Sequence, residues 1–202
     1  MKIIKRDAMS GKPIAGTVFS VKSVTGSYST SVTTGTDGSA TLSAIPAGVY
    51  VVREESVPEP YIVTNTEQTV ALRPGKTSEV RFQDYQKPGL EILKKNIATG
   101  EPIEGVTYLI EQIDGSYSTS ATTDSAGRIF LGSIPVGSYR ITEKNVPSHV
   151  ILSEIPQEVY LEAGCTRTVT FFNAVKPSLT ILKRNSVTGD PLSNAKFHIY
   201  YG

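Results

Sequence analysis

The stretch LEILKKN (residues 90–96) recurs in this chain as KIIKRD (2–7) and as LTILKRN (179–185). Alternate residues of an extended strand share one face, so each stretch places a lysine at the end of an apolar row. An ammonium group on an apolar face is unstable unless it is paired, deprotonated or consumed in a reaction. The function of the chain therefore depends on what this lysine meets. The three lysines, each 89 residues from the next, are Lys5, Lys94 and Lys183.

The repetition extends well beyond the lysine and aligns without a gap. The hexapeptide GSYSTS occupies residues 26–31 and again 115–120. In the same way, AIPAGVYVVREESVP (44–58) corresponds to SIPVGSYRITEKNVP (133–147). A period of this length indicates serial copies of one domain with the size of a small β-sandwich. The expected boundaries are 1–86 and 87–175 for two full copies, and 176–202 for the first two strands of a truncated third copy.

The pattern within each copy predicts an all-β fold. Short segments alternate apolar and polar residues, turn clusters such as TGTDG and RPGK separate them, and no helical period is sustained. A domain of this size has a small core, and secreted domains of this size usually carry disulfides. The single cysteine, Cys165, excludes an intramolecular disulfide, so extracellular domains of this kind need another source of stability. The predicted strands of the first copy are 17–22, 28–34, 39–42, 49–55, 69–72 and 78–84.

Charge and composition argue against several classes of partner. The chain has 20 basic and 19 acidic residues, a net charge of +1, so no field draws it to nucleic acid or to acidic membranes. No apolar run has the length of a membrane span, and no contact with a membrane is expected. The linkers YQKP (85–88) and AVKP (174–177) are short and contain proline, which favours an extended string of domains.

Conventional catalysis and metal binding are also disfavoured. His149 and His198 have no partners at a recognisable spacing, and surface positions are expected for both. Asp37 and Asp124 stand in turn sequences, which turn formation explains better than metal binding. Cys165 follows Gly164 in a predicted hairpin turn and is expected to be an inert, exposed thiol. We expect neither a cofactor nor a metal.

Two further strands supply polar partners for the lysine. Glu54 in the first copy and Glu143 in the second each end an apolar row on one strand face. The last strand of each copy ends in the same way with Asp84 or with Asn173. One interpretation is a buried ion pair with a hydrogen-bond partner. The exchange of Asp for Asn favours a second interpretation, amide chemistry with the lysine. A second carboxylate would add repulsion to an ion pair in one copy only, whereas the side chains of Asp and Asn are both acyl electrophiles.

Taken together, these motifs resemble the CnaB-type domains of Gram-positive surface proteins, also called SpaA-like or prealbumin-like domains. The resemblance rests on the strand lysine, the TGEPI type of turn, the IP-x-G-x-Y-x-x-x-E segment and the final V-x-F-x-(N/D). It covers both full copies and the start of the third. It implies tandem Greek-key β-sandwiches of prealbumin-like, or reverse immunoglobulin-like, topology. The chain departs from the family at one point. The strand that carries the Glu usually continues into P-x-G-Y, whereas VPEPY (57–61) and VPSHV (146–150) lack this glycine.

The resemblance also implies a covalent crosslink in each copy. In the family, the lysine of the first strand forms an isopeptide bond with an Asn or Asp of the last strand, and a Glu on a middle strand promotes the reaction. This would be a single self-modification rather than enzymatic turnover. The matching crosslink residues are Lys5 with Asp84 and Lys94 with Asn173, the matching catalytic residues are Glu54 and Glu143, and Lys183 is a crosslink lysine without its partners in this chain.

The expected function is structural. The copies would be stalk modules of an adhesin or pilus-like protein that is extracellular and anchored to a cell wall. Their partners would be neighbouring repeats of the same protein, and a host surface protein or glycan could bind through other regions. The alternatives are a repeated binding module that uses GSYSTS, or a pilin shaft subunit. Shaft pilins tend to present a lysine after a proline, whereas Lys87 and Lys176 precede one.

The truncated copy carries its own expectation. Residues 179–183 and 197–200 are strand-like and apolar, yet the remainder of their sheets is absent from the chain. Unpaired strands recruit other strands. We therefore expect residues 178–202 to be mobile or paired with a neighbouring domain or molecule, with Lys183 kept as a reactive amine.

Overall fold

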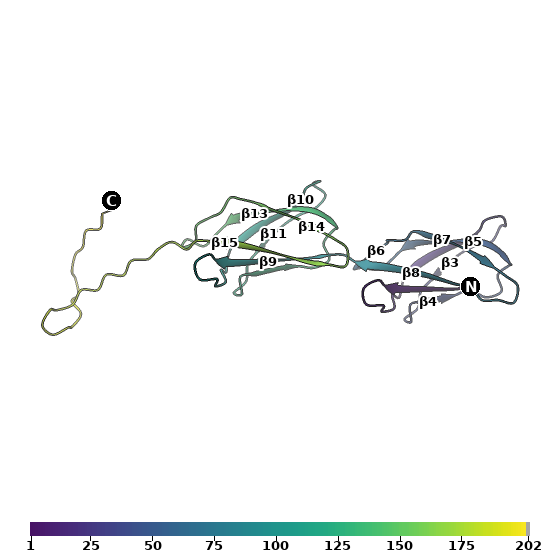
Figure 1. Cartoon of the computed structure of the whole chain (residues 1–202), viewed down its shortest axis with the longest axis horizontal. Coiled ribbons are helices and arrows are strands. Elements are labelled where there is room, and N and C mark those ends of the chain that lie inside the picture. The colour runs from purple at the N-terminus through teal and green to yellow at the C-terminus, as the bar shows by residue number, and fades with distance from the viewer. Residues whose placement is uncertain (201–202) are drawn as a thin grey trace.

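The computed structural model describes residues 1–200, and all regular structure in that part of the chain is β-strand, as the sequence predicts. The strands form two similar units along the long axis of the molecule (Figure 1). The first unit contains β1 (Lys2–Asp7), β2 (Val18–Ser23), β3 (Ser29–Thr33), β4 (Ser39–Thr41), β5 (Gly48–Ser56), β6 (Tyr61–Ile62), β7 (Glu67–Leu72) and β8 (Glu79–Gln86). The second contains β9 (Gly89–Asn96), β10 (Thr107–Gln112), β11 (Ser118–Thr122), β12 (Arg128–Leu131), β13 (Gly137–Asn145), β14 (Gln157–Leu161) and β15 (Thr166–Asn173).

Each unit is a sandwich of two sheets. The first unit pairs its strands in the orders β4-β1-β8-β6 and β3-β2-β5-β7, and the second in the orders β12-β9-β15 and β11-β10-β13-β14. The first and last long strands of each unit, β1 with β8 and β9 with β15, lie side by side and run parallel. The tandem β-sandwich architecture predicted from the period is confirmed.

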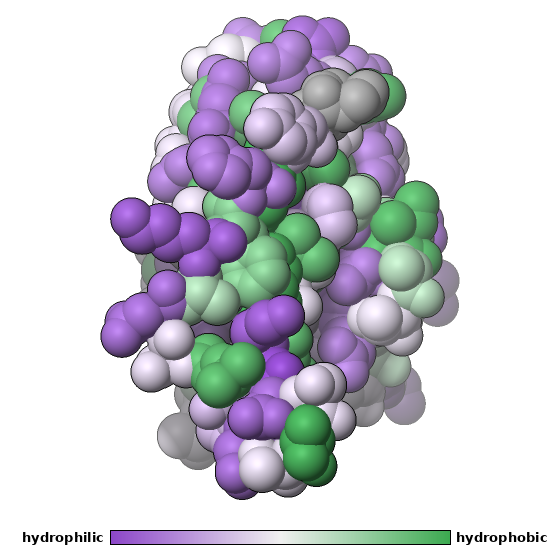
Figure 2. Space-filling model, turned by 90° about the vertical axis from the view of Figure 1, so that its left-hand side faces the viewer, coloured by the Kyte–Doolittle hydropathy of each residue, from purple (hydrophilic) through white to green (hydrophobic). Residues whose placement is uncertain are grey.

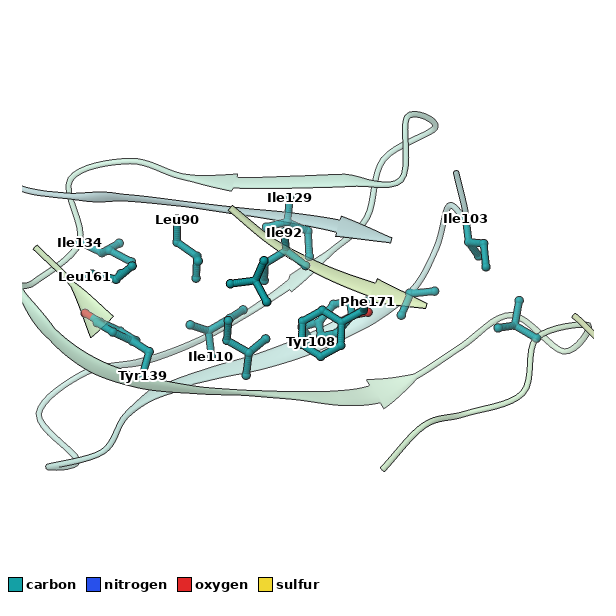
Figure 3. Close-up of a cluster of buried hydrophobic side chains, with 14 residues drawn as sticks. Leu90, Ile92, Ile103, Tyr108, Ile110, Ile129, Ile134, Tyr139, Leu161 and Phe171 are labelled. Atoms are coloured by element: carbon teal, nitrogen blue, oxygen red, sulfur yellow. The ribbon is translucent and has the colours of Figure 1, made fainter. Parts of the chain in front are cut away.

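The core of each unit lies between its two sheets and is built from alternate residues of the strands. Along β8 the burial alternates strictly, so that Val80, Phe82 and Asp84 face inward. The period-2 pattern in the sequence is therefore the pattern of the core. Figure 3 shows the core of the second unit. Its large, fully buried residues include Leu90, Ile92, Tyr108, Ile110, Tyr139 and Ile141.

All six strands predicted for the first copy are present, with ends that differ by at most two residues. The prediction missed β6 (Tyr61–Ile62), which pairs with the end of β8. This strand has only two residues, too few for an alternating pattern to be recognised. In the second unit, the corresponding contact is a single bridge between Val150 and Val175.

The two units join through a short, hydrogen-bonded connection. Only residues 87–88 separate β8 from β9. The turn between β14 and β15 reaches back to the first unit, where the amide of Gly164 donates to the carbonyl of Gln86 at 2.7 Å. Cys165, next in this turn, is half-buried at the junction, so the expectation of an exposed thiol is wrong. The first unit covers this turn, and a sequence pattern does not report such long-range cover.

The described part of the tail, residues 176–200, contains no strand, so the strand-like segments 179–183 and 197–200 are unpaired there. The tail extends away from the second unit (Figure 1) and leaves Leu179, Leu182 and Ile199 exposed. An end-on view from that side shows hydrophobic side chains at the surface among hydrophilic ones (Figure 2). The described tail forms turns at 186–188 and 193–194 and an isolated bridge between Arg184 and Pro191. Residues 201–202 of the predicted third copy lie outside the described residues.

Gly127 lies in a turn that is hydrogen-bonded to β9, the strand that carries Lys94. Its carbonyl accepts a hydrogen bond from the Lys94 amide at 2.7 Å, and its φ is +66°. A Cβ at this position would collide with the Lys94 carbonyl oxygen and lie 2.9 Å from Pro102 Cβ. We expect Gly127→Ala to lower the melting temperature of the second unit in calorimetry. The positive φ alone costs roughly 1–3 kcal/mol for a residue with a side chain, and the collision adds to that strain.

Gly115→Ala is the matched control for this prediction. Gly115 has a similar φ of +79°, but a Cβ there would have no heavy atom within 4 Å. Equal melting temperatures for the two variants would contradict the proposed role of the Gly127 turn.

Candidate functional site

The fold brings the three candidate residues of the first unit together in its core. Lys5 lies on β1 and Asp84 on the adjacent β8, while Glu54 lies on β5 of the opposite sheet. Lys5 is in register with Phe82, so Asp84 is two residues farther along the same inward face. Lys5 and Asp84 are 0% exposed and Glu54 is 3% exposed. Three ionisable side chains therefore share one site that is closed to water.

The second unit repeats this arrangement. Lys94 on β9 is in register with Phe171 on β15, and Asn173 follows on the same inward face. Glu143 reaches them from β13 of the opposite sheet. Lys94, Glu143 and Asn173 are at most 3% exposed. The exact repeat in sequence is therefore a repeat of the buried site.

In the first unit, the Lys5 amine contacts both carboxyl groups. Lys5 Nζ lies 2.8 Å from each Glu54 oxygen and donates a well-directed hydrogen bond to Oε2 only. It also lies 2.7 Å from Asp84 Oδ2. The other Asp84 oxygen accepts from the amide and the hydroxyl of Thr64, each at 3.1 Å. One oxygen of the Asp84 carboxyl is thus held by Thr64 of a loop, and the other lies against the amine.

In the second unit, Glu143 bridges the amine and the amide. Its Oε2 accepts a hydrogen bond from Lys94 Nζ at 2.7 Å, and its Oε1 accepts one from Asn173 Nδ2. The hydroxyl of Tyr108 donates to Oε2 at 3.1 Å, and the amide of Ser153 donates to Oε1 at 3.0 Å. The carbonyl oxygen of Asn173 is buried without a hydrogen-bond partner.

Burial shifts the protonation of these groups. It raises the pKa of Glu54 to about 7, and the attraction of Lys5 only partly offsets this effect, while Asp84 raises the pKa further. In the second unit, burial lowers the pKa of Lys94, although Glu143 partly offsets that effect. An aromatic ring lies near each amine, with Lys5 Nζ 5.9 Å from the Phe82 ring centre and Lys94 Nζ at the same distance from that of Phe171. These shifts favour the neutral forms of Glu54 and of Lys94.

The arrangement has the components of amide-bond formation. A primary amine is the nucleophile, and a carboxyl or carboxamide group on the neighbouring strand is the electrophile. A second carboxyl group touches the amine in both units and the amide in the second, as a group that moves protons must. The fold holds the reactants in place, which removes most of the entropic barrier to their reaction.

Other residues noted in the sequence lie away from these clusters. Lys183 is exposed in the tail, where no strand forms, so its surroundings differ from those of Lys5 and Lys94. His149 and His198 are exposed. The side chains of Asp37 and Asp124 accept hydrogen bonds from the backbone of their own turns.

Sequence reasoning missed three residues that contact the clusters. Tyr108 donates to Glu143, and Ser153 and Thr64 occupy equivalent loop positions but bind different partners. The repeat contained a signal for Tyr108, because this residue follows TGEPI at the position that Phe19 occupies after SGKPI in the first copy. No pattern indicated the loop residues.

The GSYSTS segments lie at the hairpins that lead into the edge strands β3 and β11. Their tyrosines pack on core tyrosines: the ring centres of Tyr28 and Tyr50 are 5.8 Å apart, and those of Tyr117 and Tyr139 are 5.9 Å apart. Packing in the hairpin therefore accounts for the aromatic residue in this repeated segment.

Comparison with known proteins identifies the family of these domains. The SpaA family, described as a prealbumin-like fold domain, matches residues 1–86 and 88–175. The chain therefore belongs to the SpaA family of prealbumin-like fold domains, as its motifs suggested. No curated protein matches the chain.

Solved structures share this fold at low sequence identity. Shaft pilin SpaA from Lactobacillus rhamnosus GG is 17% identical with a TM-score of 0.50, and the match covers 89% of this chain and 98% of the pilin. A mutant of that pilin is 18% identical with a TM-score of 0.52, and the match covers 88% of this chain and 98% of the mutant. The Bacillus anthracis TIE protein is 23% identical with a TM-score of 0.45 over 87% of this chain. The chain spans only 33% of the length of that structure.

Among the described residues, no helix has the length and apolar character needed to cross a membrane.

Proposed function

We propose that the two units are structural modules of a pilus-like or adhesin stalk, and that each crosslinks itself through an isopeptide bond. The observation that carries this proposal is the pair of buried clusters, in which an amine lies beside an acyl group and a carboxyl group at 0–3% exposure. Membership of the SpaA family supports it. So does the fold shared with a protein described as a shaft pilin.

In the second unit, the reaction joins Lys94 to Asn173. The amine nitrogen bonds to the side-chain carbonyl carbon, and the bond from that carbon to Nδ2 breaks. A protonated lysine gives up two protons. Through Glu143, one converts the leaving nitrogen to ammonia, and the other stays on Glu143 or makes ammonium. The two Glu143 oxygens already face the amine and the leaving nitrogen, so one carboxylate serves both transfers.

In the first unit, the same bond forms between Lys5 and Asp84, and water leaves in place of ammonia. Hydroxide is a poor leaving group, so Asp84 must react as the neutral acid. A lysinium with two carboxylates already holds the two protons that the leaving oxygen takes up: one moves from Lys5 to Asp84, and the other passes through Glu54. Proximity of Lys5 Nζ to Asp84 Oδ2, at 2.7 Å, supplies the required approach.

The crosslinks would carry mechanical load past most of each unit. Each bond connects the first strand to the last, and these strands are parallel neighbours. Tension would pass from Lys5 to Asp84 and from Lys94 to Asn173, so the segments between them would carry little force. By analogy with a disulfide that closes a loop of similar length, each bond would stabilise its unit by about 4–5 kcal/mol.

The same proposal covers location and partners. The modules would be displayed on the surface of a Gram-positive cell, attached to its wall, and would associate with neighbouring repeats or subunits of their own kind. A host protein or glycan would bind elsewhere in such a protein. The reaction occurs once for each cluster, so the modules would not be enzymes in the ordinary sense.

The tail would be the start of a third module. Its turn repeats the hydrogen bond seen in the full units: the amide of Gly189 donates to the carbonyl of Asn185, as that of Gly100 does to Asn96. Lys183 occupies the position of Lys94 in this period. In this proposal, Lys183 reacts only when the other strands of its own module complete the sandwich.

The mass of the intact chain tests the central claim. Because each cluster forms one bond, we expect the purified chain to be lighter than its sequence by one water and one ammonia. Mass spectrometry under denaturing conditions measures this difference, and digestion should yield peptides joined through Lys5 and through Lys94. The full sequence mass would leave the clusters as buried ion pairs without a bond.

Glu143→Ala tests the role of the bridging carboxyl. Both reactants remain, but the group that moves the protons is gone, so we expect the variant to lose water from the first unit and to retain the ammonia of the second. The second unit should also melt at a lower temperature. Glu158→Ala, which removes an exposed carboxyl paired with Arg140, is the control and should react fully. Complete loss of ammonia from Glu143→Ala would disprove the assigned role.

The first unit should react more slowly at high pH. A protonated Glu54 favours the transfer that converts the leaving hydroxyl to water, and burial raises the pKa of Glu54 to about 7. That proton is present below this pKa and is lost as the pH rises through it. We expect the rate of water loss during refolding to fall between about pH 6 and about pH 9. Timed mass measurements follow the reaction, and faster water loss at high pH would contradict this role of Glu54.

A further inference from the structure

The two clusters differ in what binds one oxygen of the electrophile. In the first unit, the backbone amide and the hydroxyl of Thr64 both donate to Asp84 Oδ1, each at 3.1 Å. Asp84 is 0% exposed, whereas Thr64 lies in the exposed loop between β6 and β7. This loop therefore covers the cluster and directs two donors at a single atom of the group that reacts.

The other oxygen of Asp84, Oδ2, is in place to be the leaving oxygen. It lies 2.7 Å from Lys5 Nζ, and Lys5 supplies both protons that leave as water. Glu54, which relays the second of these protons, is 2.8 Å from the same amine. The leaving oxygen must take up two protons, so it is the oxygen that contacts their source. Oδ1 is then the oxygen that remains as the carbonyl of the new amide.

The reaction places negative charge on Oδ1. Lys5 passes one proton to Oδ2, and the neutral amine bonds to the side-chain carbonyl carbon of Asp84, while one electron pair of the bond from that carbon to Oδ1 moves onto Oδ1. The second proton passes from the nitrogen through Glu54 to Oδ2, which departs as water as the pair on Oδ1 re-forms the carbonyl. Donors at about 2.7–3.1 Å from such an oxyanion lower the barrier.

The hydrogen bond from the Thr64 hydroxyl is able to strengthen as the reaction proceeds. This hydroxyl also lies 2.8 Å from the carbonyl oxygen of Gln83, and it has a single hydrogen to donate. As charge collects on Asp84 Oδ1, that oxygen becomes the stronger acceptor of the two. An interaction that is stronger in the transition state than in the ground state accelerates a reaction.

The equivalent loop of the second unit binds a different group. Ser153, the counterpart of Thr64, reaches the cluster through its amide, which donates to Glu143 Oε1 at 3.0 Å. The carbonyl oxygen of Asn173 has no hydrogen-bond partner among the described residues. One loop position therefore binds the electrophile in the first unit and the glutamate in the second, which makes Ser153 a control for Thr64.

We propose that Thr64 is a catalytic residue of the first unit, and that its amide and hydroxyl form an oxyanion hole for Asp84. The inference rests on the proposed crosslinking function and adds to it a residue that stabilises charge rather than moving protons. In the alternative, Thr64 only anchors its loop to β8 through the carbonyl of Gln83. An anchor affects how fast the unit folds, whereas an oxyanion hole affects how fast the folded unit loses water.

Thr64→Val tests the proposal in the full chain. The chain is assembled from synthetic segments in denaturant, so that it starts at its full sequence mass, and is then refolded by dilution, quenched at intervals and weighed. The variant keeps the shape of the side chain without the hydroxyl, so water loss should slow about tenfold. Ammonia loss, and refolding followed by tyrosine fluorescence, should keep their parental rates. Thr64→Ser, which retains the hydroxyl, should restore most of the rate of water loss.

Ser153→Ala is the matched control, because it removes the hydroxyl at the equivalent position and keeps the amide that binds Glu143. It should leave the rates of water and ammonia loss unchanged.

Several outcomes would overturn this inference alone: water loss at the parental rate in Thr64→Val, refolding that slows in step with water loss, or an equal slowing of ammonia loss in Ser153→Ala. If Thr64→Val does not fold, a crystal structure of the reacted parent decides. The new carbonyl oxygen should accept a hydrogen bond from the Thr64 amide, and a carbonyl directed at Glu54 would contradict the proposal. A parent chain that keeps its full mass would overturn the crosslinking function itself.

Discussion

A primary amine without access to water is the constraint on which both sandwiches depend. An isolated buried charge costs several kcal/mol, so each amine needs partners within hydrogen-bond distance. Those partners come from the adjacent strand and from the opposite sheet, and Lys5 meets Glu54 and Asp84 only when both sheets have closed. The cluster is therefore complete only in the finished fold. Its chemistry is linked to correct folding, because an open sandwich would hydrate the amine and separate the reactants.

The sequence predicted the strands and the residues that face each other, because both follow from a period of two along a strand and from the repeat. It did not predict how individual hydrogen bonds are distributed. Whether Ser153 binds Glu143, or its counterpart Thr64 binds Asp84, depends on loop positions that no local pattern specifies. The half-buried state of Cys165 was not predicted for a related reason, since it arises from contact between two units.

The tail separates local from long-range determinants of this fold. The turn at 185–190 forms without a sheet, with the amide of Asn185 donating to the carbonyl of Asp190 and the amide of Gly189 to that of Asn185. The flanking strand segment, 179–183, has the same apolar pattern as β9 and forms no strand. Asn and Gly encode the turn through their own backbone preferences, whereas a strand requires a neighbour to satisfy its backbone. The lysine motif thus acquires its buried environment only from the other strands of its module.

Load transfer along the chain depends on how the two proposed bonds are connected. The path from Asp84 to Lys94 follows the end of β8, a two-residue link and the start of β9, so it is short and already extended. An extended segment gains little length under tension, since its residues already span close to the maximum of about 3.3–3.6 Å each. The hydrogen bond from Gly164 to Gln86 braces this segment from the side. A stalk built in this way would transmit force along a nearly continuous strand, and the rest of each sandwich would not extend under tension.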